Sequence, residues 1–219
     1  MKIGVLGTGV VGETIASALI RKGHDVMMGS RTTNNAKAQA WADAQGNSAR
    51  IGSFNDTARF GELLFNCLRA EHVVPVFKAI DTTAVQGKIC IDVSNPLDFS
   101  QGPTPQVLDE YKNISLAEKL QETLPSAHIV KALNTVNYKL MVDARKVADG
   151  SHNLFICGNS THAKEQVKHF LANNFYWQPE GLLDLGDIKA AHAIEAIVPF
   201  WVLVYRSSGT PLFNFKIVQ

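Results

Sequence analysis

Residues 3–12 read IGVLGTGVVG, an apolar run that leads into three glycines with the spacing GxGxxG. This spacing is common by chance, so the flanking sequence decides its meaning. An apolar, strand-like run precedes the glycines, and a helix-like segment from about Val10 to Arg21 follows them. We therefore predict a strand, a glycine turn and a helix that together begin a βαβ unit.

The three glycines have different predicted tasks. Gly7 permits a sharp turn, Gly9 lets a ligand approach the backbone, and Gly12 lets the helix pack closely on the strand. The N-terminus of the helix carries a partial positive charge that attracts an anion. The sequence therefore predicts a pyrophosphate site, the alternative being a glycine-rich turn without a ligand. Its residues would be Gly7, Thr8, Gly9, Val10, Val11 and Gly12.

The end of the second predicted strand indicates which dinucleotide would bind. Proteins specific for NAD carry an Asp or Glu about 20 residues past the glycine loop, where it contacts the ribose 2′-hydroxyl. This chain has Gly29-Ser30-Arg31 there. A guanidinium can bind a 2′-phosphate with a forked contact, to which the Ser30 hydroxyl can add, so we predict NADP(H). Lys37 is a second candidate contact, or else a solvated helix lysine.

Short apolar runs alternate with helix-like segments along the rest of the chain. This alternation is typical of an α/β, Rossmann-type fold, with a doubly wound and mostly parallel sheet. The capping-box sequence Ser115-Leu116-Ala117-Glu118 predicts a helix that starts there and ends before Pro125. Residues 97–114 predict a loop at the carboxyl ends of the strands, where ligand pockets form. We place strands near residues 2–6, 25–28, 49–51, 62–67, 88–93, 128–133 and 153–157.

We divide the chain into a dinucleotide-binding domain, residues 1–185, and an apolar C-terminal segment, residues 186–219. The segment is too short for a core of its own, so we expect it to pack on the domain or on a second subunit, giving a homodimer. Its longest apolar run, Ala196 to Tyr205, is about half of the roughly 20 residues that a membrane span requires. We expect no membrane partner.

Composition limits the function classes further. The 219 residues include 21 basic and 20 acidic side chains without a basic cluster, which argues against a dedicated nucleic-acid binder. The three cysteines, Cys67, Cys90 and Cys157, lie far apart and form no CxxC pair. We therefore expect buried thiols rather than a metal site or disulfides. The N-terminus shows no secretory signal, so we expect a cytoplasmic protein.

Four further segments carry a family resemblance: DVSNPLD at 92–98, VKALNTVN at 130–137, GDI at 186–188 and GTPLFNFK at 209–216. With the glycine loop, they resemble the coenzyme F420-dependent NADP oxidoreductase family over nearly the whole chain. The similarity is greatest to bacterial members and extends to the cytoplasmic domain of the metalloreductases. It implies that the glycine loop, Ser30 and Arg31 hold NADP. It also implies hydride transfer between NADPH and a small-molecule acceptor, a flavin or deazaflavin such as FMN or F420.

Residues at the carboxyl ends of three predicted strands form the nicotinamide end of the predicted site. Asn66, Asn95 and Asn134 would meet at the carboxyl edge of the sheet, where amide side chains can orient a carboxamide or a flavin edge. Each could instead satisfy its own turn. Cys67 and Leu68 follow Asn66 and are further candidate contacts. We identify no catalytic residue, since hydride transfer between two rings depends on their orientation and needs no protein acid or base.

Two other functions stay open at this point. Reduction of a small carbonyl or imine compound would need a proton donor near Asn134 or Lys131, although Lys131 lies in a strand-like run that favours a structural role. A non-catalytic NADP(H) sensor is the other alternative. We expect His128 and His192 to be packing residues, and Glu195 either to pair across an interface or to be exposed.

Overall fold

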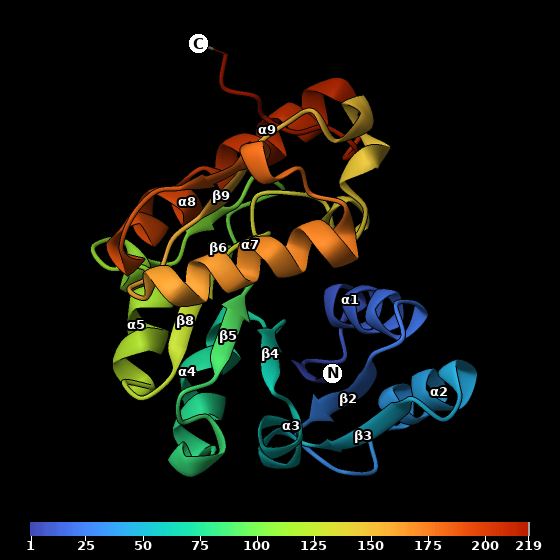
Figure 1. Ribbon diagram of the computed structural model, residues 1–219. Helices are drawn as coiled ribbons and strands as arrows, with labels where there is room; N and C mark the ends of the chain where they lie inside the picture. Colours follow the sequence, from blue (N-terminus) through green and yellow to red (C-terminus); the bar gives the residue numbers. More distant parts are fainter. Residues whose placement is uncertain (219) are drawn as a thin grey trace.

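The computed structural model describes residues 1–218, with a six-stranded sheet at the centre of the fold (Figure 1). The strand order is β3-β2-β1-β4-β5-β8, and every neighbouring pair is parallel. The order reverses between β1 and β4, and ligands of such sheets bind outside the carboxyl ends at this point. The predicted Rossmann-type fold is confirmed. The strands are β1 (Lys2–Leu6), β2 (Asp25–Ser30), β3 (Ala49–Ser53), β4 (Leu63–Asn66), β5 (Ile89–Asp92) and β8 (His128–Lys131).

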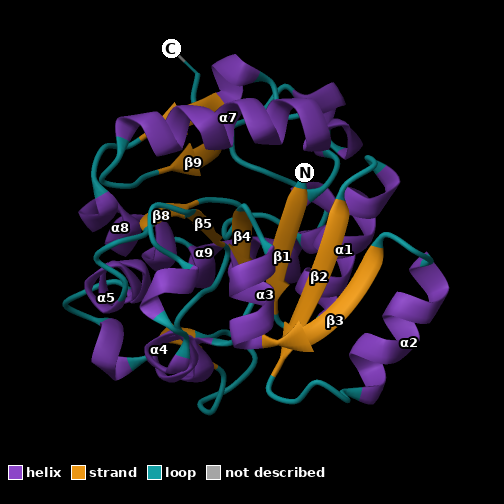
Figure 2. Ribbon diagram, turned by 60° about the horizontal axis from the view of Figure 1, so that its bottom comes forward, coloured by secondary structure: helices purple, strands orange, loops and turns teal. Residues whose placement is uncertain are grey.

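Helices cover both faces of the sheet (Figure 2). Successive strand residues point to opposite faces, so Val5 lies in the core that α1, α2 and α7 cover, and Leu6 in the core beneath α3, α4, α5 and α8. Both faces of a parallel sheet are thereby removed from water. The helices are α1 (Val10–Arg21), α2 (Ala36–Gln45), α3 (Phe54–Phe60), α4 (Ala70–Ala79), α5 (Leu116–Thr123), α6 (Tyr138–Met141), α7 (Thr161–Phe175), α8 (Ala191–Ala196) and α9 (Val198–Ser208).

Local sequence signals predicted the ends of two helices accurately. Helix α1 spans the predicted residues, and the capping box at the start of α5 is formed, since Ser115 Oγ accepts from Glu118 N at 3.0 Å. The backbone N–H of Ser115 donates in return to the Glu118 carboxylate at 2.9 Å. Helix α5 ends at Thr123, ahead of Pro125 as predicted.

The strand predicted near residues 153–157 forms outside the main sheet. This strand, β9 (Leu154–Ile156), pairs in parallel with β10 (Leu182–Asp184), which the sequence analysis did not predict. A single antiparallel bridge between Lys131 and Cys157 joins it to β8. The predicted loop at 97–114 contains a short hairpin of β6 (Leu97–Asp98) and β7 (Gln106–Val107).

The C-terminal helices differ from the expectation based on the apolar run. The helical stretch Ile188–Ser208 covers 21 residues, long and apolar enough by length and composition to cross a membrane. The length of the shorter run, Ala196 to Tyr205, therefore does not decide the question, and the absence of a membrane partner stays a prediction. Within this stretch Ala191 and Ile194 are buried in the core beside α5, whereas Phe200 and Leu203 of α9 are each about half exposed. Helix α8 is thus part of the folded core, and α9 presents an apolar surface.

Two predictions about histidines were wrong. His128 begins β8 and is exposed, and the exposed His192 places its Nε2 atom 2.8 Å from the Lys112 carbonyl oxygen. Both residues are polar surface groups rather than packing residues. The prediction of buried thiols is confirmed for Cys90 and Cys157, while Cys67 is half-buried. Burial raises the pKa of Cys157 to about 12.

Candidate functional site

The geometry of the glycine loop matches the three predicted tasks. Gly7 has φ +123°, and a Cβ atom there would lie 2.7 Å from the Cys67 carbonyl oxygen. A Cβ atom on Gly12 would lie 2.2 Å from the Gly7 carbonyl oxygen, so α1 packs directly on the loop. No atom lies within 4 Å of the Cβ position of Gly9 among the residues that the structure describes. The backbone at Gly9 is therefore open to a ligand.

The N-terminus of α1 has no side-chain cap, with Gly9 at the N-cap position. Helices α2, α3, α5 and α7 are capped by the side chains of Asn35, Ser53, Ser115 and Ser160. The first N–H groups of any helix lack partners within the helix. In α1 these donors and the partial positive charge of the helix end remain available to an anion beside Gly9.

A cavity of about 210 Å³ lies against the loop, at the carboxyl ends of β1, β2 and β4. A second cavity of about 410 Å³ shares four of its lining residues, Arg31, Phe54, Leu68 and His72. The two cavities thus form one groove, within the size range of ligand sites. The smaller cavity is lined by Gly7, Thr8, Gly9, Gly29, Ser30, Arg31, Asn35, Phe54, Cys67, Leu68, Arg69 and His72.

Arg31 lies where the two cavities meet. Its side chain is exposed, and none of the ion pairs within residues 1–218 includes it. A guanidinium without an internal partner is free to bind a phosphate in the groove. The hydroxyl of the buried Ser30 donates to the Thr32 carbonyl oxygen and so holds the turn in front of Arg31. Lys37 is exposed on α2 and lines neither cavity, so its contact stays a prediction.

The sequence analysis did not predict the larger cavity. Its walls come from the segments that follow β3 and β4, and they are mostly apolar. No short motif marks these residues, but their position after neighbouring parallel strands places them at the same edge of the sheet. The unpredicted lining residues are Ser53, Phe54, Asn55, His72, Pro75, Val76, Ala79 and Ile80.

Asn66 lies beneath the groove rather than in its wall. Its side chain is fully buried, donates to Asp92 Oδ1 at 2.8 Å and accepts from the Leu68 backbone N–H at 3.2 Å. It fixes the turn that carries Cys67 and Leu68 into the smaller cavity. A direct contact of Asn66 with the cofactor stays a prediction.

Asn95 and Asn134 meet at the carboxyl edge of the sheet as expected. Asn134 donates from Nδ2 to Asn95 Oδ1 at 2.9 Å, and Asn95 donates from Nδ2 to the Asn134 carbonyl oxygen at 2.9 Å. Leu133 precedes this pair with φ +66°, a conformation that costs a non-glycine residue energy and that often marks functional sites. Asn134 is 3% exposed, and its Oδ1 atom has no hydrogen-bond partner within the described chain.

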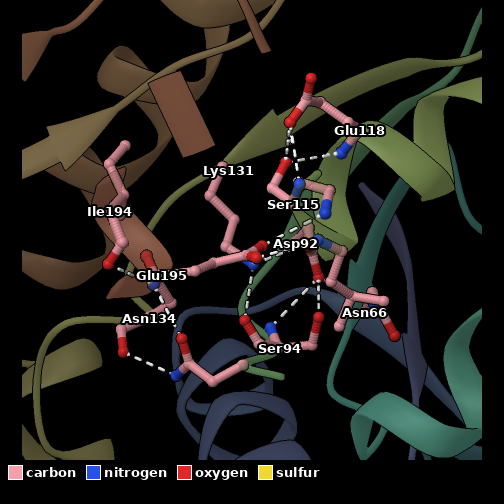
Figure 3. Close-up of polar contacts among 12 residues, drawn as sticks. Asn66, Asp92, Ser94, Ser115, Glu118, Lys131, Asn134, Ile194 and Glu195 are labelled. Carbon is pink, nitrogen blue, oxygen red and sulfur yellow. Dashed lines mark hydrogen bonds and ion pairs between the residues drawn. The ribbon is translucent and has the colours of Figure 1, made fainter. Parts of the chain in front are cut away.

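A buried cluster of charges lies behind this asparagine pair (Figure 3). Lys131 Nζ lies 2.9 Å from Asp92 Oδ2 and 2.7 Å from Glu195 Oε1, and it donates to the Ser94 carbonyl oxygen at 2.6 Å. Burial alone would lower the pKa of Lys131, but the two carboxylates raise it above its usual value, so the ammonium is retained. The structural role predicted for Lys131 is consistent with these contacts.

Both expectations for Glu195 were wrong. The residue is 2% exposed and pairs with Lys131 of the same chain instead of crossing an interface or facing solvent. Burial raises the pKa of Glu195, and the neighbouring Lys131 opposes this rise. A polar residue at a core-facing position of an apolar helix could have signalled a buried ion pair with Lys131.

The loop at 97–114 and α8 enclose a further cavity of about 170 Å³. Val107, Tyr111 and Lys112 line it from the loop, opposite His192, Glu195 and Ala196. Burial and nearby glutamates raise the pKa of Tyr111 to about 12, so its hydroxyl stays protonated at neutral pH. The loop therefore shapes a cavity next to the charged cluster.

Comparison with known proteins assigns the family. The pattern described as "NADP oxidoreductase coenzyme F420-dependent" matches residues 2–96. The F420-dependent NADP reductase of Methanocaldococcus jannaschii is 30% identical in an alignment of 223 positions, gaps included, that covers 96% of each chain. The chain belongs to this family. A solved structure from Arthrobacter sp. FB24, provisionally named an F420-dependent NADP-reductase, superposes with a TM-score of 0.92 at 38% identity, over the full length of both chains.

Other matches set the limits of the comparison. The metalloreductase STEAP3 of Rattus norvegicus is 29% identical in an alignment of 205 positions, gaps included, that covers 91% of this chain and 38% of the relative. The chain thus spans less than half the length of that metalloreductase. A reductive aminase from Aspergillus terreus, solved with NADPH, superposes with a TM-score of 0.65 at 17% identity, over 95% of this chain and 62% of that one. This likeness shows the fold alone.

The F420-dependent NADP reductase family consists of NADP-dependent oxidoreductases, and this chain is one of them. The residues of the groove fit the cofactor. The open backbone at Gly9 and the uncapped helix α1 suit the pyrophosphate, and the unpaired Arg31 suits the 2′-phosphate. The larger cavity, mostly apolar, has the character that an adenine ring needs.

Proposed function

We propose that this protein transfers hydride between NADPH and a flavin or deazaflavin, with FMN and F420 as the candidate acceptors. The observation that carries the proposal is the unpaired guanidinium of Arg31 beside the uncapped N-terminus of α1. A phosphate-bearing dinucleotide would be held at both points. The family and the F420-dependent relative from Methanocaldococcus jannaschii support the deazaflavin as acceptor.

Separate residues of the site would bind each part of the cofactor and so orient it. The loop at Gly7 to Gly12 would bind the pyrophosphate, and Arg31 would bind the 2′-phosphate. Adenine would occupy the larger cavity, against Phe54 and Pro75. The nicotinamide would then reach the Asn95–Asn134 pair across the ends of β4, β5 and β8. The bound cofactor supplies the hydride, and the protein supplies orientation.

The state of Lys131 favours a ring acceptor over a carbonyl or imine. Reduction of a carbonyl compound needs a proton donor within hydrogen-bond reach of the substrate. Lys131 is fully buried, and its ammonium is held by Asp92, Glu195 and the Ser94 carbonyl oxygen. It is therefore unsuited to donate a proton to a substrate in the groove.

The proposal is tested by steady-state NADPH oxidation with a panel of acceptors. The panel contains F420, FMN and riboflavin on one side, and small ketones, with and without an amine, on the other. Turnover with the flavins or the deazaflavin supports the proposal, and turnover with carbonyls or imines alone overturns it. Tight NADPH binding without turnover on any acceptor would favour a sensor instead.

We also propose that the protein is a cytoplasmic homodimer. The exposed apolar side chains of α9, Phe200 and Leu203, are continuous with an apolar C-terminal tail. A surface of this kind is typical of an interface between subunits. The thiols of Cys90 and Cys157 are free, as expected in a reducing compartment.

A further inference from the structure

The Glu195 carboxylate joins three elements of the fold. Besides its contact with Lys131, it accepts hydrogen bonds from the backbone N–H groups of Leu116 at 2.9 Å and Ala117 at 3.2 Å. These are the first two residues of α5, where the end of the helix favours a negative charge. One side chain from α8 therefore closes the N-terminus of α5 and pairs with the end of β8 (Figure 3).

The cluster lies directly behind the proposed nicotinamide wall. Lys131 holds the carbonyl oxygen of Ser94, the residue before Asn95. The carbonyl oxygen of Ile194, the residue before Glu195, accepts from Asn134 Nδ2 at 3.4 Å. The two asparagines of the wall are thus attached to the cluster from both sides, Asn95 through the segment after β5 and Asn134 through α8.

The cluster contains two carboxylates, Asp92 and Glu195, and one ammonium, Lys131. With both carboxylates ionised it carries an excess negative charge. All three side chains are at most 2% exposed, so solvent screens this charge poorly. Asn66 Nδ2 and the backbone N–H and hydroxyl of Ser94 donate hydrogen bonds to Asp92 Oδ1.

Hydride transfer changes the charge of the ring that would face this wall. The C4–H bond of the dihydronicotinamide breaks, and its electron pair leaves with the hydrogen to the acceptor. The neutral ring of NADPH thereby becomes the positively charged ring of NADP⁺. A fixed negative charge behind the wall stabilises the charged ring more than the neutral one.

We propose that Glu195 is a positioning residue that, through Lys131 and the Asn95–Asn134 pair, holds a negative charge behind the nicotinamide and so favours NADP⁺ over NADPH in the bound state. This inference rests on the proposed function in one respect, the place of the nicotinamide at the asparagine pair. It requires no particular acceptor.

The test is a substitution that removes the charge and keeps the size, Glu195→Gln. The ratio of the Kd for NADP⁺ to the Kd for NADPH is expected to rise about five- to twentyfold, as for the loss of one poorly screened charge. In turnover, kcat is expected to fall while the KM for NADPH changes by less than about threefold. The binding ratio is measured by fluorescence titration of each cofactor form, without an acceptor.

The matched control is Glu118→Gln. Glu118 caps the same helix end through Ser115 but has no contact with Lys131 or Asn134. The control is expected to lower the thermal stability and to leave the NADP⁺ to NADPH ratio unchanged. An equal change of the ratio in both variants, or no change in Glu195→Gln, overturns the inference.

Two further variants keep the inference testable if Glu195→Gln does not fold. Asp92→Asn removes the other carboxylate of the cluster and is expected to shift the ratio in the same direction; an unchanged ratio overturns the inference. Glu195→Asp retains the charge, so its ratio of Kd values is expected to stay within about twofold of the wild-type ratio, even where stability falls. A shift as large as that of Glu195→Gln would contradict a role for the charge.

Failure of this inference and failure of the proposed function can be told apart. The cofactor titrations contain no acceptor, so the acceptor panel can fail while the ratio still shifts as expected. Normal turnover with flavins and an unchanged ratio in Glu195→Gln would overturn only the inference. A protein that binds neither NADPH nor NADP⁺ would overturn both.

Discussion

Gly12 lies so close to Gly7 that a Cβ atom on Gly12 would be 2.2 Å from the Gly7 carbonyl oxygen, whereas the Cβ position of Gly9 is open. Gly12→Ala must therefore move α1 away from the loop, at a cost of about 1–3 kcal/mol, and is expected to lower the melting temperature.

Gly9→Ala is expected to change stability by less than about 1 kcal/mol. It should weaken the binding of NADPH at least about tenfold, because the methyl group would occupy the space of the pyrophosphate. Thermal unfolding and NADPH titration check both, and full NADPH affinity in Gly9→Ala would contradict the assigned site.

Arg31 is expected to determine the preference for NADPH. A charge-assisted hydrogen bond contributes about 1.5–3 kcal/mol, so Arg31→Ala should raise the Kd for NADPH about 10- to 100-fold. NADH lacks the 2′-phosphate, so its Kd should change little. Calorimetric titration of both cofactors measures the difference. Arg21→Ala is the matched control, because Arg21 is an exposed arginine in the last turn of α1, away from the loop, and lines neither cavity. An equal loss of affinity for NADH and for NADPH in Arg31→Ala would disprove that Arg31 binds the 2′-phosphate.

The parts of the fold that were predictable from sequence depend on short-range physical rules. The glycine spacing fixes a turn and a close packing contact within ten residues, and the capping box at Ser115 is complete within four. Alternation of apolar and helical segments then leads to a parallel sheet. The short strand β10 was missed because its three residues, Leu182–Asp184, are too few to show a period.

The unpredicted parts of the site depend on contacts between distant segments. Phe54 and Pro75 line the same cavity only because the parallel strands β3 and β4 bring the helices that follow them, α3 and α4, to the carboxyl edge of the sheet. Glu195 was misjudged for the same reason, because its partners on β8 and α5 are far away in the chain. Sequence reasoning recognised the unusual residue but could not identify a partner that only tertiary packing supplies.

The ion pair between Lys164 and Asp184 should make stability depend on acid pH. Burial alone would raise the pKa of Asp184, but hydrogen bonds from Lys164 Nζ at 2.8 Å and Gly186 N at 2.9 Å lower it below the usual value. A carboxyl with a lowered pKa stabilises the fold above the pKa of the unfolded chain, about 4, and this contribution is lost as the pH falls through the folded pKa.

Asp184→Asn is therefore expected to cost about 1–2 kcal/mol at pH 7, since Lys164 stays nearly buried while solvent screens the exposed side of Asp184. The gap between variant and wild type should begin to narrow below about pH 4 and should close only below the folded pKa of Asp184. Urea unfolding from pH 3 to pH 7 measures this. Asp109→Asn, which removes a highly exposed partner of Lys112, serves as the control and should change stability by less than about 0.5 kcal/mol. A gap as large at pH 3 as at pH 7 would contradict the assignment.

The apolar surface of α9 is expected to hold two subunits together. Phe200 and Leu203 are one helical turn apart and 52% and 51% exposed, and Leu212, Ile217 and Val218 extend the apolar character into the tail. An arginine at the centre of such an interface would be buried without a partner, so Leu203→Arg should convert a dimer into a monomer. Analytical ultracentrifugation at micromolar concentration measures the mass.

Leu185→Arg is the control for this experiment, because Leu185 is 44% exposed and lies outside α9. It should leave the dimer intact. The helical stretch Ile188–Ser208 is also apolar enough to contact lipid, so the wild type is sedimented with neutral phosphatidylcholine vesicles in parallel. A wild type that is monomeric and pellets with the vesicles would show that α9 binds a membrane surface instead of a second subunit. A wild type that is dimeric and stays in the supernatant, and that Leu203→Arg converts to a monomer, would establish α9 as the subunit interface.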